Sequence, residues 1–317
     1  MRHYFIVNPT SGPSDCTPQI KKALAGFEDR FDYEIYVTTS AGDATRFVRK
    51  KCESSTEPMR FYACGGDGTL NEVVNGAALH KHAAVGCFPC GSGNDFVKYY
   101  GGKQYFSDIG AVLAGKAQAI DVIRVNDKYC INVANAGFES KAADRMARFR
   151  RFSFFKNQRA YYPAIVMTLF DGMHNKCRIT ADDEVIFDGD MLLCTMANGS
   201  FEGGGFCAAP RADVCDGLMD VCAVKSLSIL KVPKAIGIYQ KGGHLDSDYL
   251  KPYVTYRRAR RITVEGEGEF LMALDGEIHS NTRFDLELIP GGVNFIVPHG
   301  AVHAGDEDVT PATEQAV

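Results

Sequence analysis

Two glycine-rich stretches near the start of the chain decide its fold, Cys64-Gly65-Gly66-Asp67-Gly68-Thr69-Leu70-Asn71-Glu72 and Pro89-Cys90-Gly91-Ser92-Gly93-Asn94-Asp95-Phe96. Each follows an apolar run typical of a buried strand, at 60–64 and 83–89, and each is followed by residues that favour a helical turn. Glycine lets the main chain approach a polyphosphate, and the N-terminus of the helix that follows favours an anion. A single loop of this kind is often an ordinary tight turn. Two of them so close together predict a phosphate cradle for a nucleotide.

The rest of the first third alternates strand and helix signals. Strands are predicted at 4–8 and 33–38, and helices at about 18–27 and 43–52, before the two glycine stretches. This order predicts a mostly parallel sheet covered by helices. Near 120–125 the pattern changes, because later strand signals come in close pairs separated by turns. We therefore expect a second, antiparallel domain.

Bulk properties exclude several classes of protein. The chain has 317 residues, enough for two domains, and a formal net charge of −4, which argues against a nucleic-acid partner. Its start, in which Asn8-Pro9 follows a very short apolar run, does not resemble a secretory signal. No apolar run is long enough to span a bilayer. We expect a cytoplasmic protein, at most peripheral to a membrane.

Three further patterns are better explained as structural. The eleven cysteines lie mostly in strand-like apolar runs, which favours reduced thiols over a disulfide framework. Cys87 and Cys90 have the spacing of half a zinc site, but no second pair matches them. Residues 110–117 nearly match a P-loop, yet Ala117 lacks the required hydroxyl and the apolar spacing favours one helix. The second glycine stretch also lacks the full dinucleotide fingerprint, so a Rossmann cofactor site is not expected.

Two basic regions have alternative explanations. The segment 140–168 mixes aromatic residues with seven basic ones, namely Lys141, Arg145, Arg148, Arg150, Arg151, Lys156 and Arg159. It is either a solvated amphipathic helix or a patch that contacts an anionic membrane. The cluster Arg257, Arg258, Arg260 and Arg261 allows the same two explanations.

Four motifs, in this order, resemble the diacylglycerol kinase catalytic family, which includes soluble bacterial diacylglycerol kinases and the sphingosine and ceramide kinases. They are Asn8-Pro9-Thr10-Ser11-Gly12, Gly65-Gly66-Asp67-Gly68-Thr69, Gly91-Ser92-Gly93-Asn94-Asp95 and Leu274-Asp275-Gly276-Glu277. The resemblance runs from Asn8 to about Pro298. The Gly-Gly-Asp-Gly loop alone is less specific, because NAD kinases and phosphofructokinases use a similar one.

The resemblance implies a two-domain fold with the active site in the cleft between the domains. An α/β nucleotide-binding domain like that of NAD kinase and phosphofructokinase would span 1–125, completed by a C-terminal strand at about 290–300. An antiparallel β-sandwich domain for the lipid substrate would span 126–289. The polar, acidic stretch 301–317 has no periodicity and is expected to be a flexible tail.

The resemblance also implies a nucleotide site for ATP. Carried onto this sequence, it comprises Asn8, Thr10, Thr38, Gly66, Asp67, Gly68, Thr69, Leu70, Asn71, Glu72 and Ser92. Asp67 would orient the loop or reach Mg²⁺ on the triphosphate. Asp67, Asp95 and Asp121 could form an acidic ring around that ion, since hard cations prefer oxygen ligands. For Asp121 the alternative is a polar residue at the start of a strand.

Glu277 is the expected general base, accepting the proton of a lipid hydroxyl as its oxygen attacks the γ-phosphorus. It follows a tight turn, where a carboxylate is usually only solvated, so its catalytic role is implied by the resemblance. The segment 213–218 resembles the family's structural magnesium loop. Asp216 would supply a carboxylate, and Asp213 and Leu218 would supply carbonyls. Cys215 departs from the acidic residue or asparagine of many bacterial members.

The expected function is ATP-dependent phosphorylation of a lipid hydroxyl, most simply diacylglycerol to phosphatidic acid, at the inner face of the membrane. The alternatives are a kinase for a sphingoid base, a monoacylglycerol or a polyprenol, an NAD kinase-like enzyme, and a catalytically silent nucleotide-binding regulator. A homodimer stays open, because dimers are common among the family's members.

Overall fold

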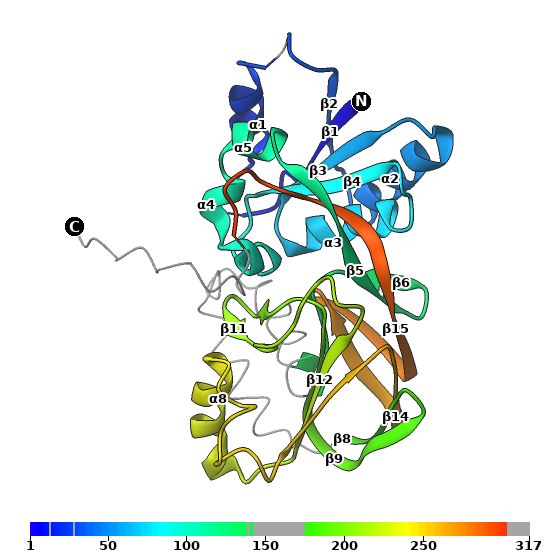
Figure 1. The fold of residues 1–317 in the computed structure, drawn as a ribbon, viewed down its shortest axis with the longest axis vertical. Helices are drawn as coiled ribbons and strands as arrows, with labels where there is room; N and C mark the ends of the chain where they lie inside the picture. The colour runs from blue at the N-terminus through cyan, green and yellow to red at the C-terminus, as the bar shows by residue number, and fades with distance from the viewer. Residues whose placement is uncertain (13, 28, 138–139, 142–174, 303–317) are drawn as a thin grey trace, which may run out of the picture.

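The computed structural model describes residues 1–12, 14–27, 29–137, 140–141 and 175–302. Figure 1 shows two halves, one of parallel strands and helices and one mostly of antiparallel strands. The basic segment 140–168, apart from its first two residues, and the end of the predicted tail, 303–317, lie outside the described residues. No helix within the described part is both long and apolar enough to cross a membrane.

The N-terminal half is a parallel sheet with helices on both faces. Its elements are β1 (Arg2–Val7), α1 (Thr17–Leu24), β2 (Tyr33–Val37), α2 (Asp43–Ser54), β3 (Met59–Gly65), α3 (Asp67–Ala77), β4 (Ala83–Pro89), η1 (Phe96–Tyr100), α4 (Lys103–Phe106) and α5 (Ile109–Leu113). The strand order is β4-β3-β1-β2. Phe5, Ile6 and Val7 are all fully buried, which is typical of a parallel strand covered on both faces. The helix predicted from the apolar spacing within the P-loop-like stretch is confirmed as α5, which ends at Leu113 before β5 begins at Lys116.

The C-terminal half is built from antiparallel strands around its own core. Its elements are β6 (Lys128–Cys130), β7 (Val133–Gly137), β8 (Asn175–Ala181), β9 (Glu184–Ala197), β10 (Phe201–Glu202), β11 (Phe206–Cys207), β12 (Met219–Lys225), η4 (Ile229–Lys231), α8 (Val232–Gln240), β13 (Val254–Ala259) and β14 (Arg261–Leu274). β9 and β14 each pair with β8 along one part and with β7 along another. Strands paired in this way enclose a core that includes Met191, Ile262 and Leu274.

Two long strands connect the halves. β15 (Glu277–Val297) pairs with β14 in the C-terminal half and then lies parallel to β4 at Asn294 and Phe295. β5 (Lys116–Val125) lies antiparallel to β15 along most of its length. The predicted fold, an α/β domain followed by an antiparallel β-sandwich domain, is confirmed. The sheet of the N-terminal half is thus extended by a strand that begins in the other half.

Candidate active site

Four predicted nucleotide-site residues follow four adjacent strands at one edge of the sheet. Asn8 follows β1, Thr38 follows β2, Gly66 follows β3, and Ser92 lies three residues after β4. Because these strands are parallel, their carboxyl ends lie at the same edge, where open α/β sheets bind ligands. Thr38 is fixed there by its N–H, which donates to the carbonyl of Val7 (2.9 Å), and Ser92 is exposed.

The first glycine stretch is the turn between β3 and α3. The N–H groups of Thr69 and Leu70 donate to the carbonyl of Gly66 (3.0 and 3.1 Å), which closes the first turn of the helix. A Cβ on Gly65 would lie 2.2 Å from Oγ1 of Thr69, so only glycine fits there. Gly68 lies in the same first turn. The turn therefore presents the positive end of an 11-residue helix at the sheet edge, as an anion site requires.

The second glycine stretch lies directly against the first. The N–H groups of Cys90 and Gly91 both donate to the carbonyl of Gly65 (2.8 and 3.1 Å). A Cβ on Gly91 would stand 2.4 Å from the Cα of Gly66, so the two backbones touch where neither residue has a side chain. The two motifs are therefore parts of one loop cluster.

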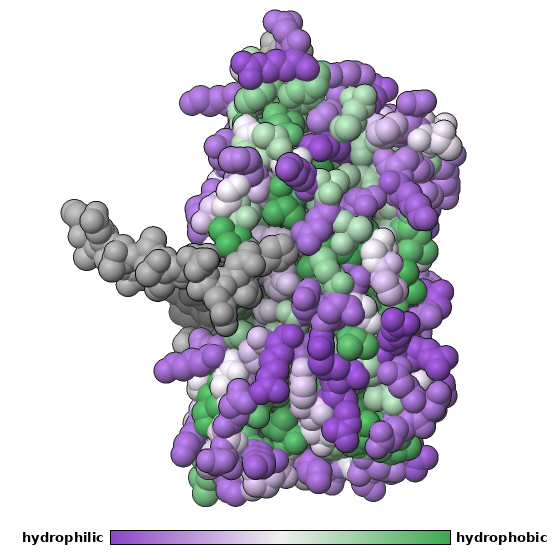
Figure 2. All heavy atoms as spheres, in the orientation of Figure 1, coloured by the Kyte–Doolittle hydropathy of each residue, from purple (hydrophilic) through white to green (hydrophobic). Residues whose placement is uncertain are grey.

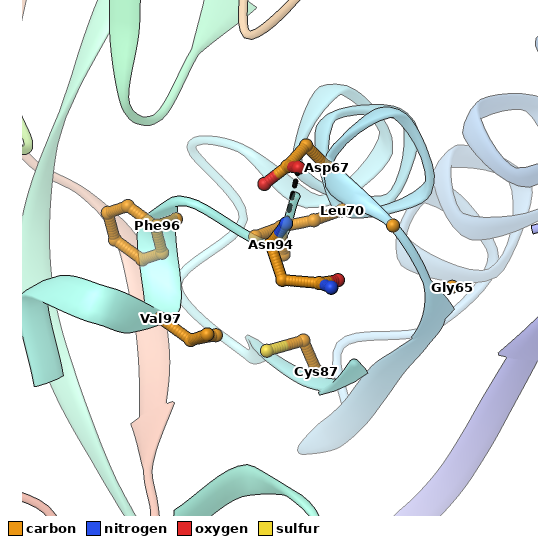
Figure 3. Close-up of a pocket in the computed structure, with 8 residues that line it drawn as sticks. Gly65, Asp67, Leu70, Cys87, Asn94, Phe96 and Val97 are labelled. Atoms are coloured by element: carbon orange, nitrogen blue, oxygen red, sulfur yellow. Dashed lines mark hydrogen bonds between the residues drawn. The ribbon is translucent and has the colours of Figure 1, made fainter. Parts of the chain in front are cut away.

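Asp67 connects the two stretches through its carboxylate. Its oxygens accept the N–H groups of Asn94 (2.6 Å) and Asp95 (2.7 Å), and Figure 3 shows the first of these bonds. Burial, together with the nearby carboxylate of Asp95, raises the pKa of Asp67 to about 6. Of the two predicted roles, the orienting one is visible in these bonds. Figure 3 also shows a small cavity below the loops, lined by Gly65, Gly66, Asp67, Leu70, Cys87, Asn94, Phe96 and Val97.

Asp95 connects the loop cluster to the C-terminal half. One of its oxygens accepts a bond from Nζ of Lys98, and the other accepts the N–H of Gly204 at 2.9 Å. Gly204 lies in the turn between β10 and β11. The glycine turn that follows Glu202 thus contacts the site directly.

The segment after β1 forms a hydroxyl network with the first helical turn. Asn8 donates from Nδ2 to Oγ1 of Thr69 (3.3 Å) and accepts at Oδ1 from the N–H and hydroxyl of Thr10 (3.0 and 2.8 Å). Ser11 approaches the same Thr69 hydroxyl at 3.3 Å. The structure therefore brings together Asn8, Thr10 and Thr69, as the prediction required.

Three predicted nucleotide-site residues direct their side chains to other parts of the protein. Leu70 is buried in the core of the N-terminal half. Glu72 accepts the N–H groups of Gly42 (2.8 Å) and Ala44 (3.1 Å), so it holds the start of α2. Asn71 donates to Oδ2 of Asp275 at 2.9 Å. These residues share the helix of the motif, but their side chains position neighbouring elements.

Glu277 reaches the loop cluster from the other half of the molecule. Asp275 (φ 49°) and Gly276 (φ 91°) form the two-residue turn between β14 and β15, and the Asp-Gly pair suits the left-handed conformation of both positions. Oε1 of Glu277 lies 3.0 Å from the position that a Cβ would take on Gly68. The predicted base therefore faces the first turn of α3.

The residue that positions this turn, Asp275, was missed by sequence reasoning. Besides Asn71, its carboxylate accepts the N–H groups of Ile131 (2.9 Å), Asn132 (2.9 Å) and Val133 (3.1 Å), and it lies 3.0 Å from Sγ of Cys130. These donors come from α3 and from the segment between β6 and β7. The only local signal was the Asp-Gly turn, which does not reveal distant donors.

Asp121 does not join the acidic pair at the glycine loops. Its two oxygens accept the N–H groups of Gly217 (2.7 Å) and Gly291 (2.9 Å), and its side chain is buried in β5. Within the described residues, no group of three or more His, Cys, Asp or Glu side chains could hold a metal ion. The predicted ring of Asp67, Asp95 and Asp121 is thus corrected to the pair Asp67 and Asp95, and Asp121 anchors the 213–218 segment, hereafter the 213–218 loop.

The two carboxylates of the 213–218 loop accept hydrogen bonds from N–H groups of the same loop. Asp213 accepts the N–H of Cys215 (2.9 Å), and Asp216 accepts the N–H of Leu218 (3.0 Å). The other oxygen of Asp216 forms an ion pair with Arg258, which also lies 3.6 Å from Asp220. The guanidinium places a positive charge beside Asp216, the predicted carboxylate ligand of a structural Mg²⁺, so such an ion would share this carboxylate with Arg258.

Comparison with known proteins agrees with this geometry. Residues 2–125 match the model of the diacylglycerol kinase catalytic domain, and residues 132–297 match that of the YegS C-terminal NAD kinase beta sandwich-like domain. The chain belongs to the diacylglycerol kinase family of lipid kinases. It is therefore an ATP-dependent lipid kinase, and its substrate is a lipid.

Individual relatives cover nearly the whole chain. The diacylglycerol kinase of Bacillus subtilis is 28% identical over 280 residues, covering 87% of this chain and 89% of that protein. The diacylglycerol kinase of Staphylococcus carnosus is 27% identical over 279 residues, covering 87% and 88%. A crystal structure of a diacylglycerol kinase from Bacillus anthracis has a TM-score of 0.71 at 23% identity, covering 95% of this chain and 98% of that one. That structure supports the fold alone.

Proposed function

We propose that this lipid kinase transfers the γ-phosphoryl group of ATP to the hydroxyl of diacylglycerol and produces phosphatidic acid. The observation that carries the proposal is the position of Glu277. This residue comes from the C-terminal half, and its Oε1 lies beside Gly68 in the first turn of α3. The names of the relatives support diacylglycerol as the acceptor. Because the acceptor is a membrane lipid, the proposal includes peripheral contact with the inner face of the membrane.

The chain's residues supply positioning and proton transfer. The N-terminus of α3 and the glycine backbones bind the phosphates, and the network of Asn8, Thr10 and Thr69 lies beside them. The acceptor oxygen attacks the γ-phosphorus, the bond to the bridging oxygen breaks, and ADP leaves. Glu277 accepts the hydroxyl proton during this step. Asp275 fixes the turn from which Glu277 extends.

Asp67 and Asp95 fit a Mg²⁺ ion that accompanies ATP. Burial and the nearby carboxylate of Asp95 raise the pKa of Asp67, and a divalent cation held by these carboxylates, one of which is paired with Lys98, would reduce that repulsion. When bound, Mg²⁺ neutralises charge between the β- and γ-phosphates. Asp67 keeps the second glycine stretch in place whether or not the ion is present, because its bonds are to backbone N–H groups.

The test is phosphate transfer from ATP into lipid in mixed micelles, with diacylglycerol, monoacylglycerol, a sphingoid base and a polyprenol compared side by side. Glu277→Gln should lower kcat by about 10²–10⁴-fold, as loss of a general base does, with the KM for ATP changed little. The matched control is Glu269→Gln, which alters an exposed carboxylate on the same hairpin. Transfer to another lipid would refute diacylglycerol as the acceptor, and near-normal turnover by Glu277→Gln would refute the assigned base.

A further inference from the structure

An exposed apolar pair lies on the outer side of the C-terminal half. Ile229 and Leu230, in η4, are 43% and 87% exposed. Single exposed apolar residues are ordinary on protein surfaces. Among the large hydrophobic side chains that the structure describes as exposed, however, these are the only two adjacent in sequence, and Leu230 is the most exposed of all. We therefore expect a binding partner to cover this pair.

Lysines lie on both sides of the pair in the sequence, and two of them contact tyrosines. Lys225, Lys231 and Lys234 are exposed, and none of them forms an ion pair with a residue that the structure describes. Lys231 donates to the hydroxyl of Tyr253 at 2.6 Å, and Nζ of Lys234 lies 4.2 Å from the ring centroid of Tyr249. Residues 225–251 hold five lysines and two aspartates, a net charge of +3 in a chain whose net charge is −4. Figure 2 shows apolar and polar surface side by side over α8.

We propose that residues 225–234, the docking tip, bind this protein to an anionic lipid surface. Leu230 and Ile229 enter the acyl boundary, Lys225 and Lys234 contact the headgroups, and the tyrosines lie at the interface between them. The proposal rests on the lipid kinase function, because the enzyme must reach an acceptor that stays in the membrane. It names the surface that makes this contact.

The charge and the size of the tip favour a lipid surface over a second copy of the chain. In a symmetric dimer through this tip, lysines would face lysines, and like charges repel. A specific protein interface buries roughly 800 Å² on each partner, far more than two side chains on one turn provide. An exposed apolar pair flanked in the sequence by lysines instead matches a layer with anionic headgroups and an acyl interior.

The tip is linked to the active site through packed elements. α8, which follows η4, packs on β11, where Phe206 meets the ring of Tyr239 at 6.5 Å. The turn that leads into β11 donates the N–H of Gly204 to Asp95. Figure 1 shows α8 and β11 on the same side of the C-terminal half. Packed elements therefore connect the docking tip to the part of this half that contacts the glycine loops.

The first experiment uses the absence of tryptophan from the chain. Leu230→Trp introduces a single fluorophore at the tip, and Val185→Trp introduces one at a matched exposed apolar site, 52% exposed, in β9. With equimolar phosphatidylcholine and phosphatidylglycerol vesicles, the Leu230→Trp emission should shift to the blue and be quenched by brominated acyl chains. The Val185→Trp emission should not change. An unshifted Leu230→Trp emission would overturn the proposal.

The second experiment measures vesicle sedimentation. Ile229→Ser/Leu230→Ser should weaken binding by about tenfold or more, as expected when two apolar side chains no longer insert. Lys225→Gln/Lys234→Gln should weaken binding to anionic vesicles by about tenfold, and the charge-matched Lys81→Gln/Lys116→Gln should not. Wild-type binding by the Ile229→Ser/Leu230→Ser variant would overturn the proposal, as would conversion of a dimer to a monomer by that substitution.

The kinase assay separates this inference from the proposed function. The Ile229→Ser/Leu230→Ser variant should phosphorylate a dispersed short-chain diacylglycerol as fast as wild type and lose turnover on diacylglycerol in vesicles. Loss on both substrates would indicate a damaged fold and count against the docking role. If no diacylglycerol is phosphorylated but vesicle binding still depends on the tip, the choice of acceptor fails and the docking surface stands.

Discussion

The glycine loops and the 213–218 loop both carry pairs of aspartates in glycine-containing turns, but their surroundings differ. At the glycine loops, Asp67 accepts two backbone N–H groups and has no cationic partner among the described residues, whereas the neighbouring Asp95 is paired with Lys98. In the 213–218 loop, Asp216 forms an ion pair with Arg258. At the glycine loops, the charge of Asp67 is therefore left for a cation that arrives with a ligand. In the 213–218 loop, the charge of Asp216 is already offset by the protein.

This difference shows that acidic motifs cannot be assigned to metals by residue type alone. Burial, and after it the neighbouring carboxylate of Asp95, raises the pKa of Asp67, and proteins tolerate the cost of such a buried charge mainly where function needs it. An ion pair such as that of Arg258 and Asp216 shapes a loop and has no spare charge for chemistry. The comparison therefore separates catalysis from folding, and the following variants test that separation.

The largest expected effect is on the glycine-loop side. Asp67→Asn should lower kcat/KM for ATP by about 10²–10³-fold, because it removes both the carboxylate available to Mg²⁺ and one of the bonds to the second stretch. Asp216→Asn, the same change in the 213–218 loop, should alter kcat/KM by only a few-fold. Steady-state kinetics of the two purified variants decides between them. Equal losses of activity would show that the two loops do not differ in role.

The next largest effect is expected when one glycine of each loop is replaced by alanine. A Cβ on Gly93 would stand 2.6 Å from Oδ2 of Asp67, whereas a Cβ on Gly217 would meet no atom closer than 3.8 Å, although Gly217 has a φ of +76°. Gly93→Ala should raise the KM for ATP by about tenfold or more, because the second stretch must move away from Asp67. Gly217→Ala should leave the KM unchanged and cost about 1 kcal/mol of stability, the usual penalty for a left-handed alanine. Nucleotide titration and thermal unfolding measure the two effects separately.

Sequence reasoning could predict the glycine loops because their parts are local. The order of strand, glycines and helix at Gly65 and at Gly91 is written in consecutive residues, and their meeting follows from parallel strands that end at one edge. The resemblance to the kinase family predicted the two-domain fold, but it placed the whole run from Gly66 to Glu72 in the nucleotide site by motif. Leu70, Asn71 and Glu72 follow the glycines in sequence, yet the helix directs them toward three different neighbours.

The other contacts of the site could not be predicted, because they join residues that are far apart in the sequence. Asp275 meets donors from Asn71 and from Ile131 to Val133, and Arg258 meets Asp216 across the pairing of β12 with β13. No local pattern encodes such meetings. The motifs behind the predicted magnesium loop and the predicted acidic ring name possible ligands, but they do not show that Arg258 lies beside Asp216 or that N–H groups bind both oxygens of Asp121.

A smaller effect, on stability, is expected when Arg258 is replaced. Arg258→Gln should lower the free energy of unfolding by roughly 1–2 kcal/mol, less than a fully buried pair would lose, because 37% of the arginine side chain is exposed. EDTA should leave the melting temperature of the wild-type protein unchanged. The matched control, Arg261→Gln, removes an exposed ion pair with Asp183 and should cost little. A large drop in melting temperature with EDTA would restore the structural Mg²⁺ and refute the arginine's role.

The smallest effect is the pH dependence of the glycine-loop side. With a pKa of about 6 in the free protein, Asp67 is charged above pH 6 and neutral below it. If the carboxylate is the active form, kcat/KM for ATP at saturating Mg²⁺ should fall about twofold at pH 6 and about tenfold at pH 5. The raised pKa means that protonating Asp67 favours the folded state, so this loss should occur without a loss of stability from that group. A bound cation lowers the pKa of Asp67. The acidic fall in kcat, which reports the complex with Mg²⁺ and ATP, should therefore occur at lower pH than the acidic fall in kcat/KM, which reports the free protein. Falls at the same pH would show that no cation reaches Asp67, and the glycine loops would then resemble the 213–218 loop in being neutralised by the protein alone.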